Sequence, residues 1–309
     1  MLLVVCSSFA QTPVWADDPV RLDDPTKSDP ITPGKPTCQI HQSTILRRTI
    51  RYCLFRLTPE TESLGDERVV YFMHGIYGSS STFEDSGYLK ALQTVAAEGG
   101  AVPTTFVTFD TEGTSFFSDE GGRNAGPRAF DTWFVQEFVP MIEKNFPVCR
   151  DRSCRAIGGL SMGGFGAIKT AFKYPHLFFR VGANSPALHP FSVWEPTAQW
   201  QSYFSRHPIG PVAGLYLLGQ VRRVFSTPQL FDENDPVGLA SRLSRLGDFP
   251  EVYWDMGGRD DFGFEEGHVK LQDALNQSGI PFQSVLVPGA DHYLFRSRNI
   301  DLVRYLTAI

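Results

Sequence analysis

The sequence has no excess of basic residues and no basic cluster. Its 28 lysines and arginines stand against 34 aspartates and glutamates, which gives a net charge of −6 with histidine neutral. This balance argues against a nucleic-acid partner. No apolar segment is long enough to span a bilayer. We therefore predict a protein without a nucleic-acid partner and without a transmembrane segment.

Signatures of metal and cofactor binding are missing as well. The sequence has no H-E-x-x-H motif, no pair of cysteines or histidines at the spacing of zinc ligands, and neither a Walker A nor a G-x-G-x-x-G pattern. We therefore expect no metal and no cofactor, so side chains and backbone groups must supply the chemistry.

The N-terminus resembles an export signal. Residues 1–10 are apolar or small, and Val14-Trp15-Ala16 resembles a small-residue cleavage site, although a positively charged region before them is missing. We predict a signal peptide over 1–16, a flexible linker rich in proline and aspartate over 17–36, and a periplasmic or secreted location. The alternative is a cytoplasmic protein.

Cysteine is scarce, with five in 309 residues. Removal of the signal peptide would leave four, and four cysteines allow three pairings. Pairing between neighbours, Cys38–Cys53 and Cys149–Cys154, is the most economical prediction. Reduced cysteines in a cytoplasmic enzyme are the alternative.

Beyond the linker, strand patterns alternate with helical patterns, which predicts an α/β domain over 37–309 with a mostly parallel sheet. A pair of early strands is expected over 43–46 and 50–57. Residues 190–248 interrupt the alternation with dispersed aromatic residues. We interpret them as an inserted cap over the site or, alternatively, as extra core helices. The polar loop 110–127 is expected to form the opposite wall.

The most informative stretch is 157–167, Ile-Gly-Gly-Leu-Ser-Met-Gly-Gly-Phe-Gly-Ala. It has the pattern of a strand, a tight turn and the start of a helix, with Ser161 at the apex. In such a nucleophile elbow the positions two before and two after the serine must be small, and here they are Gly159 and Gly163. The Met162 N–H would then point to where an oxyanion forms.

A base and an acid follow in the chain order of an α/β-hydrolase. His292 comes after a second apolar strand that ends in Pro-Gly, and Asp260 and Asp261 come after the strand that begins at Glu251. Histidine titrates near neutral pH and can activate a serine, and a carboxylate fixes its tautomer. We favour Asp260 as the acid, with Asp261 as the cap of the next helix. The other histidines are interpreted as solvated: His41, His176, His189, His207 and His268.

A glycine-bearing loop follows the early buried strand 68–73. This is where such enzymes place the second oxyanion donor, and we assign it to the Ile76 N–H. His74 is expected to orient the loop rather than to transfer protons.

Taken together, these motifs resemble the putative-esterase branch of the α/β-hydrolase superfamily over residues 45 to 309. That branch includes S-formylglutathione hydrolases, feruloyl and acetylxylan esterases and mycolyltransferases. The resemblance implies an α/β-hydrolase fold, a Ser161–His292–Asp260 triad, and an oxyanion hole from the Ile76 and Met162 amides. The segments that carry it are 74–75, 159–167, 234–236, 255–261 and 288–292.

The resemblance implies a serine carboxylic-ester hydrolase that works through an acyl-enzyme on a small-molecule or carbohydrate-linked ester. Two alternatives stay open: acyl transfer to an alcohol with the same triad, and an inactive binding module of the same fold. The identity of the ester and the oligomeric state are not fixed by the sequence.

Overall fold

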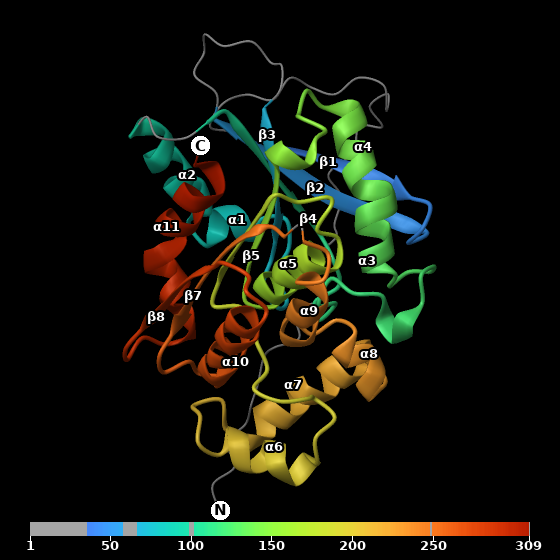
Figure 1. Ribbon diagram of the computed structural model, residues 1–309. Coiled ribbons are helices and arrows are strands. Elements are labelled where there is room, and N and C mark those ends of the chain that lie inside the picture. Colours follow the sequence, from blue (N-terminus) through green and yellow to red (C-terminus); the bar gives the residue numbers. More distant parts are fainter. Residues whose placement is uncertain (1–35, 58–66, 99–101, 248, 309) are drawn as a thin grey trace, which may run out of the picture.

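The computed structural model describes residues 36–57, 67–98, 102–247 and 249–308 (Figure 1). The predicted signal peptide lies outside the described residues, as does the predicted linker except for its last residue. No helix in the described part of the chain is long and apolar enough to cross a membrane.

An eight-stranded sheet with the order β1-β2-β4-β3-β5-β6-β7-β8 forms the centre of the molecule. β1 pairs antiparallel with β2 and β2 with β4, whereas every other neighbouring pair is parallel. The predicted mostly parallel sheet is thus confirmed. The strands are β1 (Thr37–Ser43), β2 (Arg48–Leu57), β3 (Arg68–Met73), β4 (Thr104–Phe109), β5 (Arg155–Leu160), β6 (Arg180–Asn184), β7 (Glu251–Gly257) and β8 (Gln283–Val287).

The prediction of a strand over 43–46 was wrong. Ser43 pairs with Arg48 across a turn, so the first strand ends where we expected it to begin. The Glu137 carboxylate accepts the N–H groups of Thr44 and Ile45 at 2.9 and 2.8 Å, and this distant partner stabilises a turn in place of a strand.

Helices cover both faces of the sheet (Figure 1). One apolar cluster packs α2 and α11 against one face, and a larger cluster packs α3 to α5 and α10 against the other. A π-helical turn at Phe134–Phe138 joins α3 to α4. The helices are α1 (Thr82–Asp85), α2 (Tyr88–Ala97), α3 (Phe130–Trp133), α4 (Val139–Asn145), α5 (Met162–Lys173), α6 (Thr197–Phe204), α7 (Gly210–Val224), α8 (Pro228–Asp232), α9 (Pro236–Leu243), α10 (Phe264–Gln277) and α11 (Phe295–Thr307).

Residues 190–248, which interrupt the strand–helix alternation, contain α6 to α9. Figure 1 shows α6 and α7 at one end of the molecule, beyond the sheet. Two hydrogen bonds join this end to the loop after β7: the Ile209 N–H donates to the Asp261 carbonyl at 3.0 Å, and the Tyr203 hydroxyl donates to the Gly263 carbonyl. α9, in contrast, packs against α5 and α10 with buried leucines.

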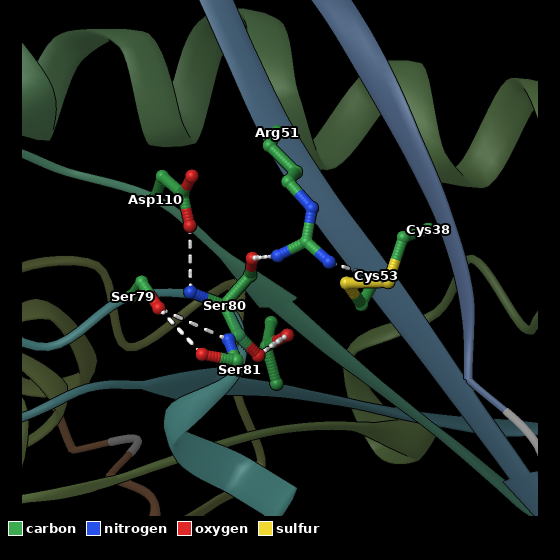
Figure 2. Close-up of a disulfide and its surroundings, with 8 residues drawn as sticks. Cys38, Arg51, Cys53, Ser79, Ser80, Ser81 and Asp110 are labelled. Carbon is green, nitrogen blue, oxygen red and sulfur yellow. Dashed lines mark hydrogen bonds between the residues drawn. A yellow bond between two sulfur atoms is a disulfide. The ribbon is translucent and has the colours of Figure 1, made fainter. Parts of the chain in front are cut away.

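Two disulfides link the four described cysteines in the predicted pairing, Cys38–Cys53 and Cys149–Cys154. Cys38 and Cys53 lie directly opposite each other on β1 and β2. Figure 2 shows Arg51 beside this bridge, where its guanidinium donates to the Ser80 hydroxyl at 2.7 Å. The bridge is thereby connected to the loop that follows β3.

Candidate active site

Ser161 occupies a sharp turn between β5 and α5. Its φ of 56° and ψ of −117° are uncommon for a residue with a side chain and cost on the order of 1–3 kcal/mol. Hydrogen bonds on both sides hold this conformation: the Ser161 N–H donates to the Asn184 carbonyl at 3.0 Å, and the Ala187 N–H donates to the Ser161 carbonyl at 3.0 Å. The strained turn raises the hydroxyl above the sheet.

The glycines around the serine are required by close backbone approach. A Cβ added at Gly159 would lie 2.3 Å from the Gly163 carbonyl oxygen, and one added at Gly163 would lie 2.1 Å from the Met73 carbonyl oxygen. Neither backbone atom can move without displacing a strand or a helix. The steric argument made from the sequence therefore holds at both positions.

Three side chains from separate loops form a continuous hydrogen-bonded chain. The His292 Nε2 lies 3.0 Å from the Ser161 Oγ, and the His292 Nδ1 lies 2.6 Å from the Asp260 Oδ2. Exposure falls from 9% at Ser161 to 5% at His292 and 0% at Asp260. Of these three hydrogen-bonded side chains, only Ser161 is therefore directed toward solvent or a ligand.

The neighbouring carboxylates make different contacts. The second oxygen of Asp260, Oδ1, accepts the Phe262 N–H at 2.9 Å. We expected Asp261 to cap the next helix, but that was wrong, because the N-cap position of α10 is Gly263 at φ 84° and no side chain caps it. The Asp261 Oδ2 instead accepts the backbone N–H of His292 at 3.2 Å.

His74 holds the loop that follows β3. Its Nε2 lies 3.3 Å from the Thr111 N–H, which must donate, so Nε2 is unprotonated and Nδ1 donates to the Gly75 carbonyl at 2.7 Å. Burial lowers the pKa of His74, with the hydrogen bond to the Gly75 carbonyl acting in the opposite direction. His74 thus keeps the neutral form that fixes the backbone just before Ile76.

The two amides assigned to the oxyanion hole, those of Ile76 and Met162, belong to residues that line one cavity together with Ser161. Among the described residues, neither N–H has a hydrogen-bond acceptor. Buried backbone N–H groups are usually paired. Two unpaired donors beside a serine hydroxyl are therefore available to a ligand.

The cavity has a volume of about 220 Å³ and a mostly apolar lining. An apolar cavity of about 150 Å³ is sufficient for benzene, so this one can hold an aromatic ring or a short aliphatic chain. Helices α6 and α7 supply much of one wall. Besides the residues already named, the lining includes Phe116, His189, Trp200, Phe204, Leu218, Val221, Phe264 and Phe295.

The loop 110–127 contributes Phe116 to the cavity. Phe116 and Phe117 both adopt positive φ, 48° and 50°, which is costly for bulky residues. A fully buried amine anchors them: the Lys169 Nζ donates to the Phe117 carbonyl and pairs with Asp131 at 3.1 Å. Sequence reasoning did not identify this anchor, because no local signal distinguishes Lys169 from a solvated lysine.

Two histidines that we expected to be solvated are buried. His268 accepts the Trp254 indole N–H at 2.8 Å within the core. His189 lies on the loop after β6, is 7% exposed and lines the cavity. Its position just past the end of a parallel strand, where ligands bind in open α/β sheets, was the signal that could have identified it.

Comparison with known proteins identifies the family of the chain. The model of the putative esterase family matches residues 48–293. An esterase of Mycobacterium tuberculosis is 32% identical over 231 residues, which cover 74% of this chain and 49% of the relative. The chain thus spans about half the length of that relative. An acetyl esterase of Caldicellulosiruptor saccharolyticus is 27% identical over 169 residues, 54% of this chain and 58% of the relative.

Solved structures share the fold. A ferulic acid esterase superposes with a TM-score of 0.66 at 22% identity and covers 88% of this chain and 97% of its own. An S-formylglutathione hydrolase from Agrobacterium tumefaciens gives a TM-score of 0.66 at 18% identity, with 88% and 94% covered. The predicted α/β-hydrolase fold is confirmed, and the chain belongs to the putative esterase family.

Proposed function

We propose that this chain is a serine carboxylic-ester hydrolase in which Ser161 is the nucleophile, His292 the general base and Asp260 the orienting acid. The observation that carries the proposal is the hydrogen-bonded chain from Asp260 through His292 to Ser161, which opens on an apolar cavity beside two unpaired amides. Membership of an esterase family supports the same reaction class.

In the first half-reaction the Ser161 Oγ attacks the ester carbonyl carbon while its proton moves to the His292 Nε2. The carbonyl oxygen becomes an oxyanion, which the Ile76 and Met162 N–H groups stabilise. One such donor is typically worth about 3–4 kcal/mol in the transition state. The protonated imidazole then donates its proton to the departing alkoxide, and the acyl group remains bound to Ser161.

In the second half-reaction water attacks the acyl carbon and gives a proton to His292. Collapse of the second tetrahedral intermediate breaks the bond to the Ser161 Oγ, which takes the proton back from the imidazole, and the free acid leaves. Throughout, Asp260 holds the Nδ1–H tautomer and stabilises the imidazolium. An alcohol in place of water would give acyl transfer by the same steps.

The cavity suits the acyl part of the ester better than the alcohol part. The alcohol leaves after the first half-reaction, whereas the acyl group stays attached to Ser161 until water has attacked. An apolar cavity that starts at the nucleophile therefore fits the group that remains. On this proposal α6 and α7 form the part of residues 190–248 that shapes the acyl site.

The proposed location is outside the cytoplasm. Structural disulfides are rare in cytosolic proteins, and the described residues include two. Expression of the full chain with cell fractionation checks this part. Recovery of the protein only in the cytoplasm, with free thiols, would contradict it.

The main test uses short para-nitrophenyl esters and a fluorophosphonate probe. Ser161→Ala should lower kcat by at least about 10³-fold and abolish covalent labelling, because the nucleophile is gone. Ser205→Ala, at an exposed helix end, is the matched control and should retain both. Unchanged turnover in Ser161→Ala would refute the proposal. Product analysis with an added alcohol acceptor distinguishes hydrolysis from transfer.

A further inference from the structure

His189 is a polar side chain within an aromatic environment. The imidazole lies on the loop after β6 and lines the cavity that contains Ser161. Among its aromatic neighbours only Trp200 has a polar atom, and that indole N–H already donates to the Ser192 carbonyl at 3.2 Å. The rings around His189, with centroids 5.7 to 6.2 Å from its own, are Phe116, Phe165, Trp200, Phe231 and Phe264.

The ring nitrogens of His189 have no hydrogen-bond partner in the described part of the chain. The Nδ1 atom is enclosed and unpaired, and no hydrogen bond joins Nε2 to another described residue. Burial lowers the pKa of His189 to about 4. The imidazole is therefore neutral near pH 7 and offers one N–H donor and one lone pair.

An imidazole in this position distinguishes between ligands. His189 is 7% exposed, and its Nε2, unlike Nδ1, is not an enclosed atom, so a water molecule can reach Nε2 when the cavity holds no ligand. A wholly apolar acyl group would displace that water and leave the ring nitrogen unpaired, which carries a desolvation cost. An acyl group with a hydroxyl at the right depth replaces the water's hydrogen bond. The site therefore disfavours a wholly apolar acyl group and accepts an acyl group that carries a hydroxyl.

We propose that His189 is a specificity-determining residue that hydrogen-bonds a hydroxyl on the acyl group, so the preferred substrates are esters of hydroxylated aryl or alkyl acids. This inference rests on the proposed function, because it takes the cavity to be the acyl site of an esterase. It extends that function by naming a substrate class and the side chain that selects it.

The test compares para-nitrophenyl esters of phenylpropanoate with those of its meta- and para-hydroxy derivatives, whose phenols cannot reach their own ester carbonyl. The leaving group is constant, and the two isomers place the hydroxyl at different depths. For at least one isomer the wild-type protein should show a kcat/KM about tenfold above that of the parent ester, the size expected for one well-placed hydrogen bond at a desolvated site.

Variants assign the preference to the imidazole. His189→Phe keeps an aromatic ring without nitrogen and should reduce the ratio of hydroxylated to parent kcat/KM to about one. His189→Gln keeps a donor and an acceptor and should retain part of the ratio. Leu218→Met, an apolar change in the same cavity, is the control; it should shift both esters alike and leave the ratio unchanged. Because the ratio compares two esters on the same variant, a packing defect that affects both esters alike does not change it.

The outcomes separate this inference from the proposed function. If the parent ester is hydrolysed in a Ser161-dependent way but no isomer is preferred, or if His189→Phe keeps the preference, the inference is wrong and the esterase proposal stands. If no ester is hydrolysed, the esterase proposal is in question. Calorimetric titration of Ser161→Ala with the methyl esters then decides the inference, since equal affinity for hydroxylated and parent esters overturns it.

Discussion

Replacement of Asp260 by asparagine should lower kcat by about 10⁴-fold, whereas the same change at Asp261 should lower it only a few-fold. The two carboxylates are adjacent in the sequence and both contact His292, but through different atoms. Asp260 accepts from the imidazole Nδ1 at 2.6 Å, and Asp261 accepts from the backbone N–H at 3.2 Å. The pair of substitutions therefore separates catalysis from loop positioning.

The large effect expected at Asp260 follows from its second oxygen. Because Oδ1 accepts the backbone N–H of Phe262 at 2.9 Å, an asparagine must place its carbonyl oxygen there. Its NH₂ group then faces the His292 Nδ1, which must become the unprotonated nitrogen. The proton moves to Nε2, and the base that should take the Ser161 proton is lost. A 10⁴-fold loss corresponds to about 5.4 kcal/mol in the transition state.

The small effect expected at Asp261 follows from the simplicity of its contact. A single N–H donates to it, and the carbonyl oxygen of an asparagine can accept that hydrogen bond equally well. What is lost is one negative charge next to a peptide group, worth well under about 1 kcal/mol for a partly exposed site. Asp261→Ala removes the acceptor and should cost more, about tenfold in kcat.

The assay is steady-state hydrolysis of a short para-nitrophenyl ester at pH 7.5, with each rate divided by the total concentration of folded protein. Circular dichroism and urea unfolding show whether each variant is folded. Equal losses in the two asparagine variants, or a larger loss at Asp261, would contradict the assignment of Asp260 as the acid. A wild-type rate in Asp260→Asn would contradict the triad as a whole.

Two further predictions concern the fold. Gly163→Ala should destabilise the protein by about 3 kcal/mol or more and abolish activity, because its Cβ would lie 2.1 Å from the Met73 carbonyl oxygen. In contrast, a Cβ added at Gly219 on α7 has no atom within 4 Å, so Gly219→Ala should stabilise the protein by up to about 1 kcal/mol. Equal urea midpoints for Gly163→Ala and Gly219→Ala would refute this reasoning. Burial lowers the pKa of both His189 and His268 from 6.5 to about 4, so the stability that each neutral ring contributes is complete above pH 6.5 and is lost as the pH falls through 4. Relative to its phenylalanine variant, the wild type should therefore lose about 3 kcal/mol per histidine between pH 7 and pH 4 in urea titrations, and a difference independent of pH would contradict the burial of that ring.

The elbow and the order of the three catalytic candidates could be predicted because their signals are local. Gly159 and Gly163 are fixed by contacts within a few residues of Ser161 or with the adjacent strand. Asp260 and His292 follow strand patterns whose carboxyl ends must meet at one edge of a parallel sheet. For these residues the local sequence pattern was therefore sufficient to predict their place in the fold.

Other features depend on distant partners and could not be derived locally. The turn after β1 is stabilised by Glu137, more than 90 residues away. The burial of His189 depends on aromatic side chains from several elements of the chain, and the role of Asp261 depends on the backbone of His292. The local sequence favoured a strand over 43–46, a solvated side chain at His189 and a helix cap at Asp261. In each case packing between distant segments determined a different outcome.

Two hydrogen bonds link the wall of the cavity to the loop that contains Asp260. Ile209, which lines the cavity, donates its N–H to the carbonyl of Asp261, and Tyr203 on α6 donates to the carbonyl of Gly263. Asp260 lies within the loop that these two bonds hold. We therefore expect a ligand that displaces α6 or α7 to shift the Asp260 carboxylate as well. On the proposed function, we expect changes in the cavity wall to act on both kcat and KM, and we expect a ligand of the correct size to favour a competent triad through the same contacts that bind it.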